Sequence, residues 1–133
     1  MGKRYLIDSN VVIGYLDKKL PDGAMKAMDA VIDDLPHISV ITKIEVLRFN
    51  TSDSNYLILK DFIAESIVLG LNDDVVDLTI SICKSNKIKL PDAIIAATAI
   101  VYNFSLLTRN IGDFKNIADL EFINPWDTEL KIS

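Results

Sequence analysis

The N-terminal segment constrains the fold of this chain most, because a short apolar run passes directly into a helical pattern. Residues 5–7 are apolar, Asp8 opens a polar triplet, and apolar residues return with helical spacing at Val12, Ile13 and Leu16. This pattern predicts a buried strand followed at once by a helix. Asp8 would then lie at the carboxyl end of the first strand. In an open α/β sheet, ligands bind at that edge, because strand ends and helix N-termini meet there.

The same strand-to-helix pattern recurs along the chain. We expect further strands at residues 37–41, 67–69, 104–108 and 120–123. After the first helix, we expect a helix that Asp22 caps and that runs to Leu35, and another that Asn72 caps and that runs to about 86. The other expected helices run from Thr42 to about 49, through 57–62 and over 93–102, and a loop or single turn is expected at 109–114. Strands that alternate with helices predict parallel βαβ units. The 133 residues show no linker and no low-complexity segment, so we expect one domain over residues 1–133.

Composition excludes several classes of protein. With 50% hydrophobic and 25% charged residues, the chain is typical of soluble globular proteins. No apolar stretch approaches the ~18 residues of a membrane span, and we expect a cytoplasmic protein with no membrane partner. The only cysteine, Cys83, is expected to be a buried small hydrophobe in a reducing compartment. The net charge of −5 argues against a protein that coats nucleic acid through a basic face.

Four acids lie where a strand has just ended or a helix begins: Asp8, Glu45, Asp92 and Asp113. Each also has a purely structural interpretation. Asp8 could cap the first helix, and Glu45 stands three residues after Thr42, the spacing of a capping box. Asp92 lies in a first helical turn, where the helix dipole favours a negative charge, and Asp113 lies in a turn. Taken together, however, these positions converge on one edge of a parallel sheet.

Carboxylates gathered at one edge would need a counter-charge. Two unit charges about 4 Å apart at an effective dielectric of 20 repel by roughly 4 kcal/mol, so the cluster would bind protons or a cation. Oxygen ligands without cysteine or histidine favour Mg²⁺ or Mn²⁺ over zinc, and His37 is the only histidine. Bound Mg²⁺ usually keeps waters and contacts phosphate, which indicates phosphodiester chemistry.

The ordered set of motifs resembles the PIN-domain family, and within it the small VapC-type toxin ribonucleases of toxin–antitoxin pairs. The matching segments are residues 5–10, 39–45, 90–92 with 95–99, and 106–110 with 113–114. The resemblance implies a three-layer α/β/α sandwich with a central parallel sheet of four to five strands. It also implies RNA cleavage by metal-activated water at a Mg²⁺ or Mn²⁺ site. Asp8 and Asp92 are expected as direct ligands, with Glu45 and Asp113 as ligands or as a base acting through water.

The resemblance extends to supporting residues and partners. Asn10, Thr108 and Asn110 match positions that support the acids or the metal-bound water, and Ser9 stands where many members have threonine. RNA is the implied substrate, and the implied partners are a cognate antitoxin protein and a second copy of the chain.

Three basic residues near these segments, Arg109, Lys87 and Lys89, are candidates for contacts with RNA phosphates. Ordinary surface charge is the alternative for each. Two other functions compete with the nuclease. One is a protein-binding module that keeps the fold without chemistry. The other is a phosphatase or phosphate acceptor that uses Asp8 as its nucleophile, although a haloacid-dehalogenase-like phosphatase would need a second acid at the position of Asn10.

Overall fold

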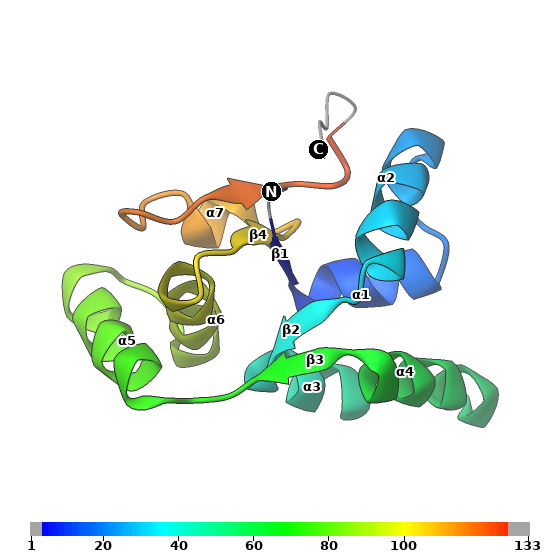
Figure 1. The fold of residues 1–133 in the computed structure, drawn as a ribbon, viewed down its shortest axis with the longest axis horizontal. Helices are drawn as coiled ribbons and strands as arrows, with labels where there is room; N and C mark the ends of the chain where they lie inside the picture. The colour runs from blue at the N-terminus through cyan, green and yellow to red at the C-terminus, as the bar shows by residue number, and fades with distance from the viewer. Residues whose placement is uncertain (1–3, 128–133) are drawn as a thin grey trace.

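Residues 4–127, which the computed structural model describes, contain a sheet of five parallel strands in the order β3-β2-β1-β4-β5. The strands are β1 (Tyr5–Ile7), β2 (His37–Ser39), β3 (Ile67–Leu69), β4 (Ser105–Leu107) and β5 (Phe122–Ile123). The first strand therefore lies in the middle of the sheet, between β2 and β4 (Figure 1). This arrangement confirms the predicted parallel α/β fold, and it puts the end of β1 at the centre of one edge.

Seven helices cover the two faces of the sheet in the described part of the chain. They are α1 (Ser9–Leu16), α2 (Asp22–Asp33), α3 (Val40–Leu47), α4 (Asp53–Glu65), α5 (Asp73–Ser85), α6 (Leu90–Val101) and α7 (Ile111–Phe114). Figure 1 shows α5 and α6 on one side of the strands and α1, α2 and α4 on the other. None of the helices within residues 4–127 has the length and apolar character needed to span a bilayer.

Alternating side chains of β1 supply both hydrophobic cores. Tyr5 and Ile7 belong to the core formed with α1 to α4, where Met28 is fully buried. Leu6 belongs to the core formed with α5 to α7, where Phe114 is fully buried. Burying one such side chain stabilises the folded state by about 1.5–3 kcal/mol. Since β1 buries side chains on both faces of the sheet, it is held in place from both sides. The backbone at Asp8, the next residue, is fixed with it.

The boundary between β2 and α3 differs from the prediction. The strand ends at Ser39 and the helix begins at Val40, two residues before the predicted start at Thr42. The Ser39 hydroxyl accepts a hydrogen bond of 3.1 Å from the Thr42 amide, so Ser39 is the N-cap. The capping-box interpretation of Thr42 and Glu45 is therefore wrong. The β-branched residues Val40 and Ile41 resembled strand continuation, but the cap determines the start.

Three smaller predictions are also wrong. Asp22 is the first residue of α2 rather than its cap, and Pro21 occupies the cap position without a side-chain hydrogen bond. Leu35 lies beyond the end of α2, where a φ of 70° turns the chain and leaves the side chain 50% exposed. Cys83 is exposed rather than buried. It follows Ile82, the last residue of the buried stripe of α5, and one step of 100° rotates its side chain away from the core.

Candidate active site

Asp8 lies at the junction of β1 and α1 and is the most buried of the four predicted acids, with 5% of its surface exposed. One carboxylate oxygen accepts a hydrogen bond of 2.8 Å from the Ser9 amide, so Asp8 does cap α1. The other oxygen accepts hydrogen bonds from the Asn10 side-chain amide at 3.2 Å and the Thr108 hydroxyl at 2.8 Å. Burial raises the pKa of Asp8, the hydrogen bonds lower it, and the charge of Glu45 raises it further.

The loop after β4 is bound to the start of α1 through the groups that contact Asp8. Thr108 is fully buried, and its hydroxyl accepts a hydrogen bond of 3.0 Å from the Asn110 amide. The Arg109 amide donates to the side-chain oxygen of Asn10 at 3.0 Å. This second bond fixes which end of the Asn10 amide faces Asp8. The structure thus brings together the three predicted supporting residues, Asn10, Thr108 and Asn110, around one carboxylate.

Glu45 reaches the same site from the last turns of α3. It is half-buried, and its carboxylate accepts a hydrogen bond of 2.6 Å from the Ser9 hydroxyl. Because α3 begins at Val40, Glu45 lies beyond the first turn and is free to face α1. Ser9 therefore serves two acids, with its backbone amide on Asp8 and its hydroxyl on Glu45.

Asp92 completes the buried part of the site from the first turn of α6. Its pKa is raised to about 6, first by burial and then by the charges of Asp8, Asp113 and Glu45, while Lys89 lowers it. Asp113 lies on α7, is exposed, and accepts a hydrogen bond from the side chain of Asn110. The four predicted acids thus come from four separate segments and repel one another in one place.

The donor set fits a hard divalent cation, although it is not arranged as a finished coordination shell. Within residues 4–127, no group of three or more acidic, histidine or cysteine side chains is placed so as to hold a metal ion. Glu45 is turned toward Ser9 and Asp113 toward Asn110, so these two would have to rotate. The ligands are carboxylate oxygens, which Mg²⁺ and Mn²⁺ prefer. A cation would also relieve the repulsion that raises the pKa of Asp92.

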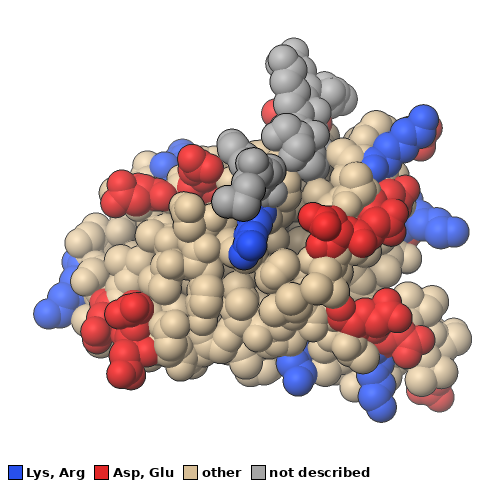
Figure 2. Space-filling view, in the orientation of Figure 1, with Lys and Arg blue, Asp and Glu red and all other residues tan. Residues whose placement is uncertain are grey.

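The three basic residues predicted to contact phosphate have different surroundings. Lys89 is the N-cap residue of α6, and its positive charge lowers the pKa of Asp92. Lys87 is exposed in the loop before it. The guanidinium of Arg109 lies 4.7 Å from the ring centre of Trp126, a cation–π contact. On the face shown in Figure 2, lysine and arginine side chains stand singly or in small groups rather than as a continuous basic surface.

Two residues at the site were not predicted from the sequence. Trp126 packs its indole against α1 at Gly14, where an added Cβ would lie 2.6 Å from the ring. This contact holds the segment after β5 beside Arg109. The available signals were a glycine inside a helix and the only tryptophan of the chain, but neither pattern indicates its partner.

A parallel sheet with β1 at its centre and acids clustered at the carboxyl ends of the strands defines an α/β domain with an acidic site. The sequence profile of the PIN domain matches residues 5–120, and the chain belongs to the PIN domain family. Members of this family are generally nucleases.

Solved structures with the same fold support this assignment. A toxin–antitoxin complex from Klebsiella pneumoniae has a chain 25% identical, with a TM-score of 0.72. A DNA-bound VapBC from Salmonella typhimurium has a chain 20% identical, with a TM-score of 0.77. VapBC2 from Rickettsia felis, bound to a DNA fragment from its promoter, has a chain 23% identical, with a TM-score of 0.74. Each match covers 92% of this chain and 98% of the other. No curated protein sequence matches the chain significantly.

Proposed function

We propose that this chain is a Mg²⁺- or Mn²⁺-dependent ribonuclease and the toxin of a toxin–antitoxin pair. The observation that carries the proposal is the convergence of four acids from distant segments, where Asp8 is buried and hydrogen-bonded to Thr108 and Asn10 and the charges of Asp8, Asp113 and Glu45 act on Asp92. Such a cluster binds protons or a cation, and a divalent cation would supply the counter-charge at neutral pH. Membership of a family that is generally nucleolytic supports phosphodiester hydrolysis.

The side chains suggest a division of roles. Asp8 and Asp92 would hold the cation, and the hydrogen bonds from Thr108 and Asn10 favour the ionised form of Asp8 that binding requires. When bound, the cation would activate a water molecule and neutralise negative charge on the phosphate oxygens. Glu45, held by Ser9, would accept the proton of that water. Asp113 is the other acid placed for this role.

Basic residues at the rim complete the proposed substrate site. Lys89 and Arg109 would contact phosphates on either side of the bond that is cleaved, because phosphate contacts position a nucleic acid strand. RNA is the substrate that the motif resemblance favours. Because the net charge of the chain is −5, binding would depend on the metal and on local contacts rather than on a broad electrostatic surface.

An antitoxin and a second copy of the chain are the proposed protein partners. The solved structures with this fold include toxin–antitoxin complexes, which supports an antitoxin for this chain. The second copy is proposed from the motif resemblance, and Val76 and Ile80 on α5, which are 41% and 51% exposed, are apolar residues that such an interface would cover. Analytical ultracentrifugation of the purified chain tests the second partner, with a monomer at all concentrations as the result against it.

The decisive experiment is cleavage of total cellular RNA by the purified protein with Mg²⁺ or Mn²⁺. EDTA and Asp8→Asn should each abolish discrete fragments, with a loss of about 100-fold or more for the variant. Asp77→Asn is the matched control, because Asp77 is an exposed acid on α5. Cleavage that persists in EDTA or in Asp8→Asn would contradict the proposal.

The two alternative functions make different predictions. A binding-only module should show no stabilisation by Mn²⁺, whereas a ligand at 100 times its Kd raises the unfolding free energy by about 2.7 kcal/mol. A haloacid-dehalogenase-like phosphatase that used Asp8 as nucleophile would need a second acid two residues later. That position is Asn10, whose amide donates to Asp8. The nuclease is therefore the function that the site supports best.

A further inference from the structure

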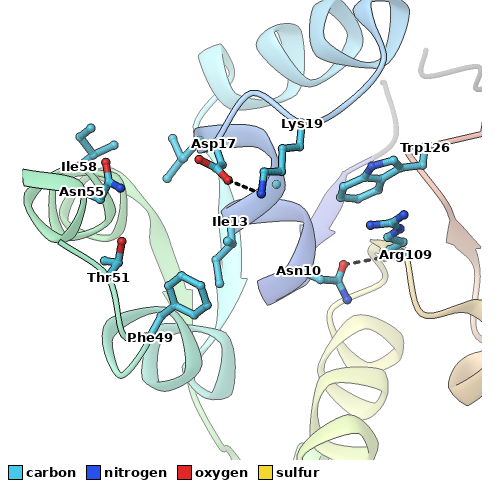
Figure 3. Close-up of a pocket in the computed structure, with 12 residues that line it drawn as sticks. Asn10, Ile13, Asp17, Lys19, Phe49, Thr51, Asn55, Ile58, Arg109 and Trp126 are labelled. Atoms are coloured by element: carbon cyan, nitrogen blue, oxygen red, sulfur yellow. Dashed lines mark hydrogen bonds and ion pairs between the residues drawn. The ribbon is translucent and has the colours of Figure 1, made fainter.

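A cavity of about 460 Å³ lies directly beside the acidic site. Helix α1 forms its floor, and the segment after α3 together with α4 forms one wall, from which Phe49, Thr51 and Asn55 project (Figure 3). Arg109 and Trp126 form the opposite wall. Its volume lies in the range of small-ligand sites, which is about 300–1,000 Å³.

Shared residues connect the cavity to the acids. Asn10 lines the cavity and donates a hydrogen bond to the carboxylate of Asp8. Arg109 lines it as well, and its backbone amide holds the side chain of Asn10. A strand whose phosphate lay at Asp8 would therefore have its neighbouring nucleotide at the mouth of the cavity.

The walls offer the groups that bind an unpaired base. Arg109 is stacked on the ring of Trp126 at 4.7 Å, which makes a flat cationic and aromatic platform. Phe49 stands on the opposite wall, and its side chain is 45% exposed, so its ring is available to a ligand. Aromatic and guanidinium planes stack on bases of single-stranded RNA. The hydroxyl of Thr51 and the amide of Asn55 are suited to hydrogen bonds with a base edge.

We propose that this cavity binds the base of one unpaired nucleotide adjacent to the phosphate held at the acids, and so sets the sequence preference of cleavage. The inference rests on the proposed nuclease function, because it assumes that an RNA strand crosses Asp8. The charge of the rim agrees with this occupant. Lys19 is paired with Asp17 at 3.0 Å, whereas the guanidinium of Arg109 lies against Trp126 on the opposite wall (Figure 3), where its positive charge favours an anionic nucleotide.

The test uses Trp126 as a reporter, because it is the only tryptophan of the chain. The full-length protein is titrated in Mg²⁺ with one-nucleotide RNA probes, the ribonucleoside 5′-monophosphates of the four bases, which contain no phosphodiester bond to cleave. We expect saturable quenching of the tryptophan fluorescence, with different affinities for the four bases. Phe49→Ala should weaken binding by about 5- to 100-fold, the effect of removing one stacking partner. Tyr56→Ala is the matched control, since Tyr56 is a partly exposed aromatic residue of α4 outside the cavity.

Cleavage mapping in Mn²⁺ then separates this inference from the proposed function. Support requires that Phe49→Ala still cleaves RNA but at a shifted set of bonds, while Tyr56→Ala cleaves as the wild type does. Unchanged cleavage sites in Phe49→Ala, with no fluorescence response to any RNA probe, would overturn the inference and leave the nuclease intact.

The remaining outcomes are also distinct. A wild-type protein that does not cleave RNA, yet shows the Phe49-dependent response, would refute the nuclease and keep the base-binding cavity. A tryptophan response to a protein partner and to none of the RNA probes would assign the cavity to protein and overturn the inference.

Discussion

Thr108 donates a 2.8 Å hydrogen bond to Asp8, a residue one hundred positions earlier in the chain. The same buried hydroxyl accepts a hydrogen bond from the Asn110 amide. One oxygen atom directly after β4 therefore contacts both Asp8 and the loop that carries Asn110. We expect Thr108→Val, which keeps the shape and removes the hydroxyl, to lower the unfolding free energy by about 1–3 kcal/mol. Urea denaturation measures this loss. Mn²⁺ affinity should fall by about 10- to 100-fold, as for other residues that orient metal ligands.

Thr108→Ser is the control for the hydroxyl. It removes a buried methyl group, which costs about 1 kcal/mol, but it keeps both hydrogen bonds. Its Mn²⁺ affinity should therefore stay within a few fold of the wild type. Equal losses of affinity in the serine and valine variants would show that packing, and not the hydroxyl, supports Asp8.

The raised pKa of Asp92 predicts how stability changes with pH in the metal-free protein. The folded state binds this proton with a pKa of about 6, against an ordinary value of 3.8. Protonation therefore favours the folded state, and the stabilisation is fully present below pH 3.8 and is lost as the pH rises through about 6. Asp92→Asn should reduce the fall in unfolding free energy over this interval and should be more stable than the wild type at neutral pH. Denaturation in EDTA over a series of pH values provides the measurement.

A variant of an exposed acid controls for general charge effects in that experiment. Asp74→Asn, on the outer surface of α5, should follow the wild-type pH profile. A wild-type profile in Asp92→Asn would mean that Asp92 does not carry the raised pKa. Mn²⁺ should also bind more weakly below pH 6, because protons and the metal compete for the same carboxylates.

Ser9 predicts a role for a single hydroxyl in aligning Glu45. Ser9→Ala removes the 2.6 Å hydrogen bond to the Glu45 carboxylate but leaves the Ser9 amide on Asp8. Metal-dependent cleavage should fall by about 10- to 100-fold, while thermal stability changes little because Ser9 is only half-buried. Ser9→Thr retains the hydroxyl and should cleave as the wild type does. Full activity in the alanine variant would show that the Ser9 hydroxyl is not needed to align Glu45 for cleavage.

Alanine substitutions at two helical glycines, Gly14 and Gly23, test the contact between Gly14 and the Trp126 ring. At Gly14, a Cβ would lie 2.6 and 2.7 Å from atoms of the Trp126 ring, closer than carbon atoms can approach. Gly14→Ala should therefore destabilise the fold by about 1–3 kcal/mol, which exceeds the 0.5–1 kcal/mol that alanine contributes to a helix. At Gly23 of α2, a Cβ meets nothing within 4 Å. Gly23→Ala should show only the helix gain.

Thermal unfolding and tryptophan fluorescence distinguish the two glycine variants. Displacement of Trp126 in Gly14→Ala should shift its emission toward that of a solvent-exposed indole, and Gly23→Ala should leave the emission unchanged. A stable Gly14→Ala protein with wild-type emission would show that the ring does not rest against Gly14 in solution.

Local patterns predicted much of this fold because local chemistry determines it. The Asn72 cap of α5 is confirmed by its 2.9 Å hydrogen bond from the Val75 amide, and a strand at residues 67–69 is confirmed as β3. The start of α3 was predicted wrongly because the strand propensity of Val40 and Ile41 favours a longer strand, which hides the N-cap preference of Ser39. Cys83 was misplaced because one helical step separates the core from the surface.

The candidate site divides in the same way. The four acids were predicted because the sequence pattern places each after a strand or at the start of a helix, and parallel strands end at one edge. For Glu45 the position within the helix was wrong, because α3 begins at Val40 and Glu45 lies in its last turns. The partners of these acids were not predicted. The bond from Ser9 to Glu45 and the contact of Trp126 with Gly14 join segments far apart in sequence, and no local pattern determines such distances.

The central place of β1 also affects how the protein is made. Its neighbours are β2 and β4, and β4 is synthesised about one hundred residues after β1, which takes roughly 5–20 s at typical elongation rates. Until then, Asp8 lacks Thr108, and α6 with Asp92 has no completed sheet to pack against. In a nascent chain, Asp8 and Thr108 therefore stay apart until β4 has been synthesised. The proposed site is therefore complete only after β4 has joined β1, so the activity proposed for it depends on a late pairing in the sheet.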